Sequence, residues 1–138
     1  MTVSSRQAMR ELAAALAQRV RPGDVITIRG ALGSGKTTFV GGLAAALVGG
    51  DPATSPTFTF RQRYGTRDRV LVEHLDLYRV EDESDLLELG LEEAFGPNVV
   101  TVIEWPERAP SLAGKPAWRV EIVGCGDAAR EVTIAPGA

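Results

Sequence analysis

The chain has 138 residues, of which 44% are hydrophobic and 24% are charged, and its net charge at pH 7 is −3. This length predicts one domain over residues 1–138 that buries about two thirds of the surface of the unfolded chain. The negative charge argues against nucleic-acid binding by bulk charge, and no apolar run approaches the roughly 18 residues of a membrane span. The single cysteine, Cys125, excludes an internal disulfide, and the N-terminal residues lack the apolar core of a signal peptide. We therefore expect a cytoplasmic globular domain.

The first 50 residues predict a helix, a strand and a second helix. Ser4 and Gln7 have the spacing of a capping box, and apolar residues at helical spacing predict a helix that ends near Pro22. An apolar strand at 25–29 follows, and then a helix from about 38 to 48.

The rest of the chain predicts mainly strands. Helices alternate with strands early and strands dominate late, so we expect an α/β fold with a mixed β-sheet flanked by helices. The predicted elements are strands at 58–64, 70–77 and 99–104, acid-rich helical turns at 83–95, a loop at 112–116, and a hairpin of strands at 118–123 and 131–134.

Between the first strand and the second helix lies a match to the phosphate-binding motif G-x-x-x-x-G-K-[ST]. Glycines there let backbone N–H groups turn toward phosphate oxygens. Lys36, one of only two lysines in the chain, brings an ammonium group to the β- and γ-phosphates, and the Thr37 hydroxyl is placed to bind Mg²⁺. The motif therefore predicts a nucleotide-binding loop at the positive end of a helix dipole. Its residues are Gly30, Ala31, Leu32, Gly33, Ser34, Gly35, Lys36 and Thr37.

Two acids and a hydroxyl are candidates to complete this site. Glu104 closes the apolar run 99–104, and Asp76 lies at the end of the strand 70–77, where acids that hold a metal or orient water are found. Which of the two orients water stays open. Thr57 follows the second helix, where nucleotide switches place a hydroxyl that senses Mg²⁺ and the γ-phosphate. His74 is more often structural than catalytic at such a place, and Trp105 packs on either the nucleotide or the core.

Taken in order, these segments resemble the TsaE family, also called YjeE, small bacterial ATPases of tRNA threonylcarbamoyladenosine biosynthesis. The resemblance covers nearly the whole chain, and the ordered set of segments is far more specific than the loop alone. The segments are Gly30–Thr38, Ser55–Phe58, His74–Arg79 and Ile103–Pro106.

The resemblance implies roles for individual residues. Lys36, Thr38 and the loop would hold the phosphates of ATP. Thr37 and Glu104 would hold Mg²⁺, and Asp76 would be the second essential acid.

Further positions follow from the same resemblance. Thr57 would lie in a switch-like segment, and Arg108 and Arg130 match family positions near the nucleotide. This chain departs from the family pattern at Ala31, where an aspartate is usual, and at Met9, where a threonine is frequent. We therefore carry over no nucleotide contact from the first helix.

The resemblance also implies partners. Family members support transfer of threonylcarbamoyl to adenosine 37 of tRNAs that read codons starting with A. They act by binding the TsaD–TsaB pair, and their ATPase activity is weak until that complex forms. We therefore expect a Mg²⁺-dependent ATPase that is a monomer when isolated and touches tRNA only through the complex. The acidic stretch 81–93 and the arginine-rich stretch 61–69 are candidate docking surfaces.

Three other functions stay open at this point. A small-molecule kinase needs an acceptor pocket and an arginine-bearing lid, for which little length remains. A signalling GTPase needs an Asn/Thr-Lys-x-Asp element, whereas the only other lysine, Lys115, lies in Gly-Lys-Pro-Ala. A nucleotide-gated adaptor would bind ATP only to control docking.

Overall fold

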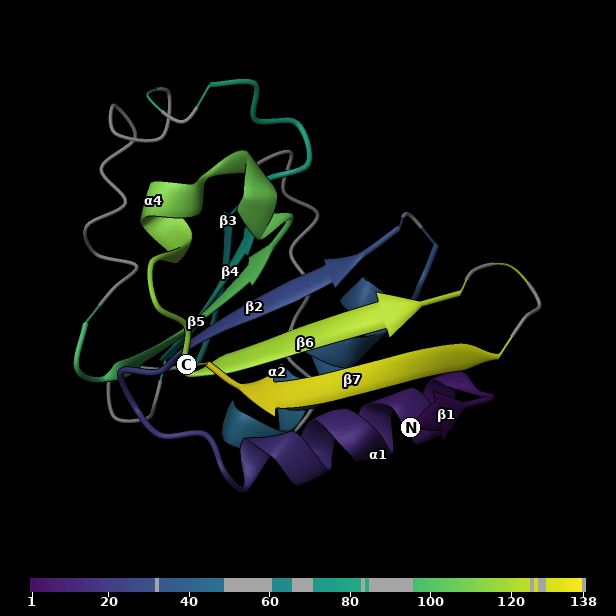
Figure 1. Ribbon diagram of the computed structural model, residues 1–138. Coiled ribbons are helices and arrows are strands. Elements are labelled where there is room, and N and C mark those ends of the chain that lie inside the picture. The colour runs from purple at the N-terminus through teal and green to yellow at the C-terminus, as the bar shows by residue number, and fades with distance from the viewer. Residues whose placement is uncertain are drawn as a thin grey trace.

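The computed structural model describes residues 1–31, 33–48, 61–65, 71–82, 84, 96–124, 126 and 129–137. In these residues seven strands form one sheet in the order β1-β7-β6-β2-β5-β4-β3 (Figure 1). The strands are β1 (Thr2–Val3), β2 (Val25–Gly30), β3 (Arg61–Tyr64), β4 (Leu71–Asp76), β5 (Val99–Glu104), β6 (Trp118–Val123) and β7 (Arg130–Pro136). The helices are α1 (Arg6–Ala17), α2 (Lys36–Val48), the 3₁₀ turn η2 (Pro106–Arg108) and the short α4 (Pro110–Ala113).

The centre of the sheet is parallel and its edges are antiparallel. Strand β2 pairs in parallel with both β5 and β6, and β4 pairs in parallel with β5. Strand β3 is antiparallel to β4, and β7 is antiparallel to β6 and β1. The predicted mixed sheet flanked by helices is confirmed. In such sheets the carboxyl ends of the parallel strands share one edge, where ligands bind.

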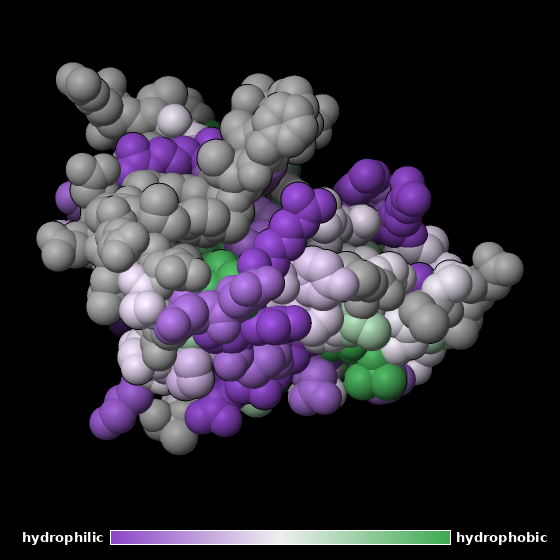
Figure 2. Space-filling view, turned by 90° about the horizontal axis from the view of Figure 1, so that it is seen from above, coloured by the Kyte–Doolittle hydropathy of each residue, from purple (hydrophilic) through white to green (hydrophobic). Residues whose placement is uncertain are grey.

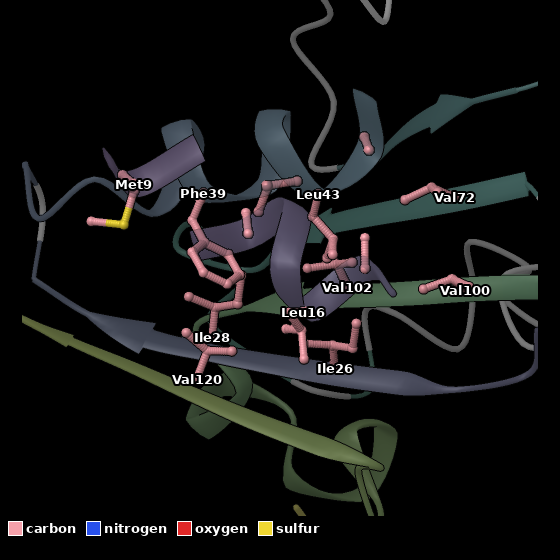
Figure 3. Close-up of a cluster of buried hydrophobic side chains, with 14 of the residues drawn as sticks. Met9, Leu16, Ile26, Ile28, Phe39, Leu43, Val72, Val100, Val102 and Val120 are labelled. Carbon is pink, nitrogen blue, oxygen red and sulfur yellow. The ribbon is translucent and has the colours of Figure 1, made fainter. Parts of the chain in front are cut away.

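Helices α1 and α2 cover one face of the sheet and enclose the main core. In α2, Phe39 and Leu43 are fully buried and point toward the sheet, where Ile28 and Val102 lie beneath them (Figure 3). Buried residues of α1 recur at the spacing of one helix face, which explains why the predicted amphipathic pattern forms a helix here.

The other face of β4 and β5 carries a second, smaller cluster. Leu75 and Ile103 are fully buried there together with Ala109, which follows η2. Both strands are therefore buried on their two faces, which fits the largely apolar run of β5.

Two local predictions differ from the structure. The N-cap of α1 is Ser5 rather than Ser4: its backbone is extended, and its Oγ accepts a hydrogen bond from the N–H of Ala8 at 3.0 Å. The helix ends at Ala17, before the predicted end near Pro22. The next turn is tighter and has hydrogen bonds between residues three apart, from Arg19 N to Leu16 O and from Val20 N to Ala17 O.

The predicted loop at 112–116 is in part helical. Pro110 begins α4, since proline presets the helical φ at the first position of a helix. Gly114, with a φ of 53°, ends it. The expectations for Ser55–Phe58 with Thr57, for the helical turns at 83–95 and for Cys125 lie outside the described residues, as do most of the two candidate docking stretches.

Seen from above the view of Figure 1, the coloured residues of the surface are mainly hydrophilic, and the hydrophobic ones lie in small separate areas (Figure 2). Among the described residues, the exposed large hydrophobic side chains are Met1, Tyr78 and Val123. They belong to three different parts of the fold, before β1, after β4 and at the end of β6. No helix in the described residues has the length and apolar content that a membrane crossing requires.

Helices α1 and α2 pack closely at Gly42. A Cβ atom at Gly42 would lie 2.9 Å from Arg10 Cα and 3.1 Å from Arg10 O, whereas a Cβ at the neighbouring Gly41 would meet nothing within 4 Å. Only a residue without a side chain allows α1 to approach α2 this closely.

We expect Gly42→Ala to lower the free energy of unfolding by about 1–3 kcal/mol, because the backbone of α1 must move away. The matched variant Gly41→Ala adds the same methyl group in open space and gains up to about 1 kcal/mol from helix propensity. Urea unfolding followed by circular dichroism compares the two. Equal stability of both variants would contradict the packing argument.

Candidate active site

The phosphate-binding motif forms the turn from β2 into α2. Gly33 and Gly35 have φ values of 76° and 104°, in the left-handed region where a side chain is disfavoured. The turn closes with a hydrogen bond from Ser34 N to Ala31 O at 3.1 Å, and α2 begins with one from Phe39 N to Gly35 O at 2.9 Å. The backbone of the loop thus requires glycine at positions 33 and 35.

The side chain of Arg130 joins this loop to the β6–β7 hairpin by hydrogen bonds. Its Nε donates to the carbonyl of Ser34 at 2.9 Å. Its Nη2 donates to the carbonyls of Gly33 at 3.1 Å and Gly126 at 3.0 Å. A residue expected near the nucleotide therefore holds the backbone of the phosphate loop.

Lys36 is 5% exposed and lies between a carbonyl and an aromatic ring. Its Nζ donates to the carbonyl of Gly30 at 2.6 Å and lies 3.6 Å from the centroid of the Trp105 ring. Burial lowers the pKa of Lys36 from its ordinary value of 10.5, whereas the nearby charges of Glu104, Asp76 and Glu107 oppose this shift. The ammonium group is held at the loop, where partial burial favours an anionic partner.

The two candidate acids end neighbouring strands in register. Asp76 of β4 is paired with Glu104 of β5, so both carboxylates emerge at the same edge of the sheet. Glu104 is 3% exposed, and its Oε2 lies 2.5 Å from Nε2 of the buried His74. Asp76 is exposed, and its Oδ1 accepts a hydrogen bond from the N–H of Tyr78 at 3.1 Å. The two carboxylates thus occupy very different environments: that of Glu104 is buried and that of Asp76 is exposed.

Trp105 follows Glu104 in a strained conformation. Its φ of 58° and ψ of 50° make it the one non-glycine residue with positive φ in the part of the chain that the structure describes. Besides covering Lys36, its ring lies 5.0 Å from that of Tyr78. The indole contacts a cation and another aromatic ring, and it also packs against the smaller core cluster.

These groups line one cavity of about 580 Å³. From the predicted set, the described lining includes Gly33, Ser34, Gly35, Lys36, Thr37, Thr38, Asp76, Glu104, Trp105 and Arg130.

Other predicted residues lie elsewhere. Gly30 ends β2 and accepts the hydrogen bond of Lys36, and Ala31 is exposed beside the lining. Arg108 lies exposed on η2 and is not part of the cavity wall. Leu32 and Thr57 lie outside the described residues.

Sequence reasoning missed one wall of the cavity. It is formed by the segment that leads from β1 into α1, with Arg6 and Met9 among its residues. A Cβ on Gly35 would lie 3.2 Å from the Met9 methyl carbon, so this helix touches the loop. The sequence indicated this wall only through Met9, where the chain departs from the family pattern. The pairing of β1 with β7 brings the segment to the cavity, and no local sequence pattern predicts that pairing.

The donors of the cavity fit a magnesium-bound nucleotide. The Thr37 hydroxyl and the carboxylates of Asp76 and Glu104 are hard oxygen ligands of the kind that Mg²⁺ takes. The described residues form no group of three or more His, Cys, Asp or Glu side chains that could hold a metal alone. A Mg²⁺ ion shared with phosphates needs only one or two protein ligands. Ser34 belongs to the same lining, and its buried Oγ has no hydrogen-bond partner among the described residues.

Comparison with known proteins gives consistent matches. A family model described as "Threonylcarbamoyl adenosine biosynthesis protein TsaE" matches residues 3–132. The tRNA threonylcarbamoyladenosine biosynthesis protein TsaE of Bacillus subtilis is 41% identical over 129 residues, which are 93% of this chain and 77% of that protein. The protein of the same name from Treponema pallidum is 37% identical over 113 residues, 82% of each chain. The crystal structure of Bacillus subtilis YdiB superposes with a TM-score of 0.78 at 30% identity, over 100% of this chain and 84% of the other.

The backbone of Trp105 can be tested separately from its ring. Trp105→Gly and Trp105→Ala both remove the indole, but only glycine adopts positive φ freely. The left-handed conformation costs a residue with a Cβ about 1–2 kcal/mol, which exceeds the roughly 0.5–1 kcal/mol entropic cost of glycine. We therefore expect Trp105→Gly to be the more stable variant, by about 1 kcal/mol, in urea unfolding. A more stable alanine variant would show that this backbone is unstrained.

Proposed function

Because the chain belongs to the TsaE family, whose members are involved in tRNA threonylcarbamoyladenosine biosynthesis, we propose that it is a Mg²⁺-dependent ATPase serving that modification. One observation carries the proposal. A glycine-rich loop, its lysine, a threonine hydroxyl and two strand-end carboxylates line a single cavity. This is the set of groups that phosphoryl transfer from a nucleoside triphosphate requires.

The loop and Lys36 neutralise the phosphates. In the structure the ammonium of Lys36 is bonded to the Gly30 carbonyl. A triphosphate offers it anionic oxygens, which make charge-assisted hydrogen bonds about twice as strong as neutral ones. Burial strengthens this preference, since a desolvated ammonium gains more from a charged partner.

Thr37 and Glu104 would hold Mg²⁺. When bound, the ion neutralises charge that develops on the β- and γ-phosphate oxygens. Thr37 is the second residue of α2, and Glu104 is the last residue of β5; both line the cavity. The two ligands would therefore come from the end of the loop and from the sheet.

We assign the orientation of the attacking water to Asp76. Glu104 is buried and already bonded to His74 through one oxygen. Asp76 is exposed and, among the described residues, its hydrogen bond uses Oδ1, so that Oδ2 can accept a hydrogen from water. Its exposure would also keep the basal rate of the isolated chain low, because bulk water disturbs the position of a water bound to this carboxylate.

The partners that we propose are TsaD and TsaB, in transfer of threonylcarbamoyl to adenosine 37 of tRNA. Asp76 and Tyr78 are both exposed at the end of β4, beside the cavity. A protein docked over them would exclude water and fix the attacking molecule. In this arrangement the chain hydrolyses ATP in the cytoplasm, and tRNA is contacted only through the complex.

Two variants separate ATP binding from ATP turnover. Lys36→Ala removes the buried cation, and we expect ATP affinity to fall by about 10–100-fold. Asp76→Ala leaves the loop intact, so affinity stays near that of the unmodified chain while single-turnover hydrolysis falls by about 10²–10⁴-fold. Calorimetric titration with ATP and quenched-flow hydrolysis measure the two quantities.

The other lysine provides the control for charge. Lys115 is exposed outside the cavity, so Lys115→Ala should leave both quantities unchanged. Full turnover by Asp76→Ala would remove that residue from the chemistry. A preference for GTP, or a phosphorylated metabolite in place of free phosphate, would replace the ATPase assignment by a GTPase or a kinase.

The second experiment tests the partnership. We expect the single-turnover ATPase rate to rise many-fold when the TsaD–TsaB complex is added, because the complex completes the open side of the cavity. Bovine serum albumin at equal concentration is the control for crowding. Binding of ATP with no hydrolysis in either condition would support the adaptor function instead.

A further inference from the structure

His74 has a place in the site that neither the motif nor the family comparison assigns. It is 7% exposed on β4, and its Nε2 lies 2.5 Å from Glu104 Oε2. His74 and Glu104 come from adjacent parallel strands and point to the same face, since Val102, two residues before Glu104, is the register partner of His74. The contact is therefore set by the sheet and not by a flexible loop.

The direction of this hydrogen bond follows from the chemistry of the carboxylate. An ionised carboxylate only accepts hydrogen bonds, so Nε2 of His74 carries the hydrogen and donates it. The bond occupies Oε2. Among the described residues, Oε1 is then the oxygen of Glu104 that remains to face the cavity.

We propose that His74 is a positioning residue that holds Glu104 in the orientation in which it binds the metal of the nucleotide. This inference rests on the proposed Mg²⁺-ATP function of the cavity. Carboxylates that bind metals are commonly held by hydrogen bonds from a second layer of residues, and loss of such a partner weakens metal binding by about 10–100-fold.

Lys36 explains why Glu104 needs to be held. The charge of Glu104 acts on Lys36 more strongly than that of any other carboxylate, and it opposes the fall of the lysine pKa. A carboxylate free to rotate in this low-dielectric pocket would turn toward the ammonium group. His74 keeps one oxygen on the β4 side, so Lys36 stays available for phosphate and Glu104 for the cation.

Strand β3 pairs with β4 and places a glutamine opposite the imidazole. Gln62 is the register partner of His74, and Tyr64, on the same face, donates its hydroxyl to Gln62 Oε1 at 2.6 Å. Burial raises the pKa of Tyr64, and the charge of Glu104 raises it further, so this hydroxyl stays protonated beside the carboxylate. The layer behind Glu104 is thus polar, packed and largely buried.

The test measures metal binding apart from hydrolysis. The protein is saturated with a non-hydrolysable ATP analogue, and Mn²⁺ is titrated with electron paramagnetic resonance detection. We expect His74→Phe, which keeps a ring but no donor, to raise the Mn²⁺ dissociation constant by about 10–100-fold. Affinity for the analogue in EDTA stays unchanged, because the loop and Lys36 are untouched.

Three further variants make the result decisive. His74→Gln carries an amide nitrogen near the position of Nε2, and we expect it to restore Mn²⁺ binding close to that of the unmodified chain. Val72→Ala, a buried residue on the same face of β4, is the control for packing and should leave Mn²⁺ binding unchanged. If His74→Phe does not fold, as judged by circular dichroism, His74→Leu makes the same measurement with a smaller side chain.

The possible failures are distinguishable. If the unmodified chain binds neither the analogue nor Mn²⁺, the proposed function is wrong. If it binds both and the donor-free variant binds Mn²⁺ equally well, only the role of His74 is wrong. Loss of Mn²⁺ binding in Val72→Ala, or no recovery in His74→Gln, likewise contradicts positioning by a donor.

Discussion

The site depends on the register of three adjacent parallel strands. Glu104 of β5 is level with Asp76 of β4 on one side and with Ile28 of β2 on the other, two residues before the loop begins. A slip of one residue in β5 would turn Glu104 to the opposite face of the sheet and present its neighbour Ile103 instead. The register is fixed because Val100 and Val102 are buried on the same face as Glu104. The apolar core thus determines where the acid lies.

Burial of charge is the second constraint, and it gives each charged group a specific partner. Lys36 is bonded to a carbonyl and covered by an indole, and Glu104 is bonded to an imidazole. Each charge left without such a partner would cost several kcal/mol of desolvation. The ammonium and the carboxylate thus lie in one pocket, and each is bonded to a partner of its own. The pocket can therefore take an anion that brings its own cation. Asp76, to which the proposed mechanism assigns the attacking water, is the acid that stays exposed.

Local patterns predicted the elements and the chemistry of the site but not the contacts between them. The loop, Lys36, Asp76 and Glu104 were found because motifs and strand ends are local, and the structure brings them to one cavity. The contact of His74 with Glu104 joins residues 30 apart, and it depends on the register of β4 and β5. The attachment of Arg130 to the loop spans 96 residues. No pattern in the sequence predicts the positive φ of Trp105, because tertiary packing imposes it.

The contact between the two helices links stability of the fold to the shape of the site. The residue that brings α1 and α2 together is Gly42, and the residues of α1 that face the loop include Met9. Both belong to the same rigid helix pair, so the approach allowed at Gly42 also sets how closely Met9 lies to Gly35. The wall of the cavity that α1 forms is therefore positioned by the packing of α1 against α2 at Gly42, and not by the loop itself. A side chain at position 42 would move α1 outward and widen the cavity on the side of Arg6. The helix interface is therefore among the determinants of the shape of the cavity.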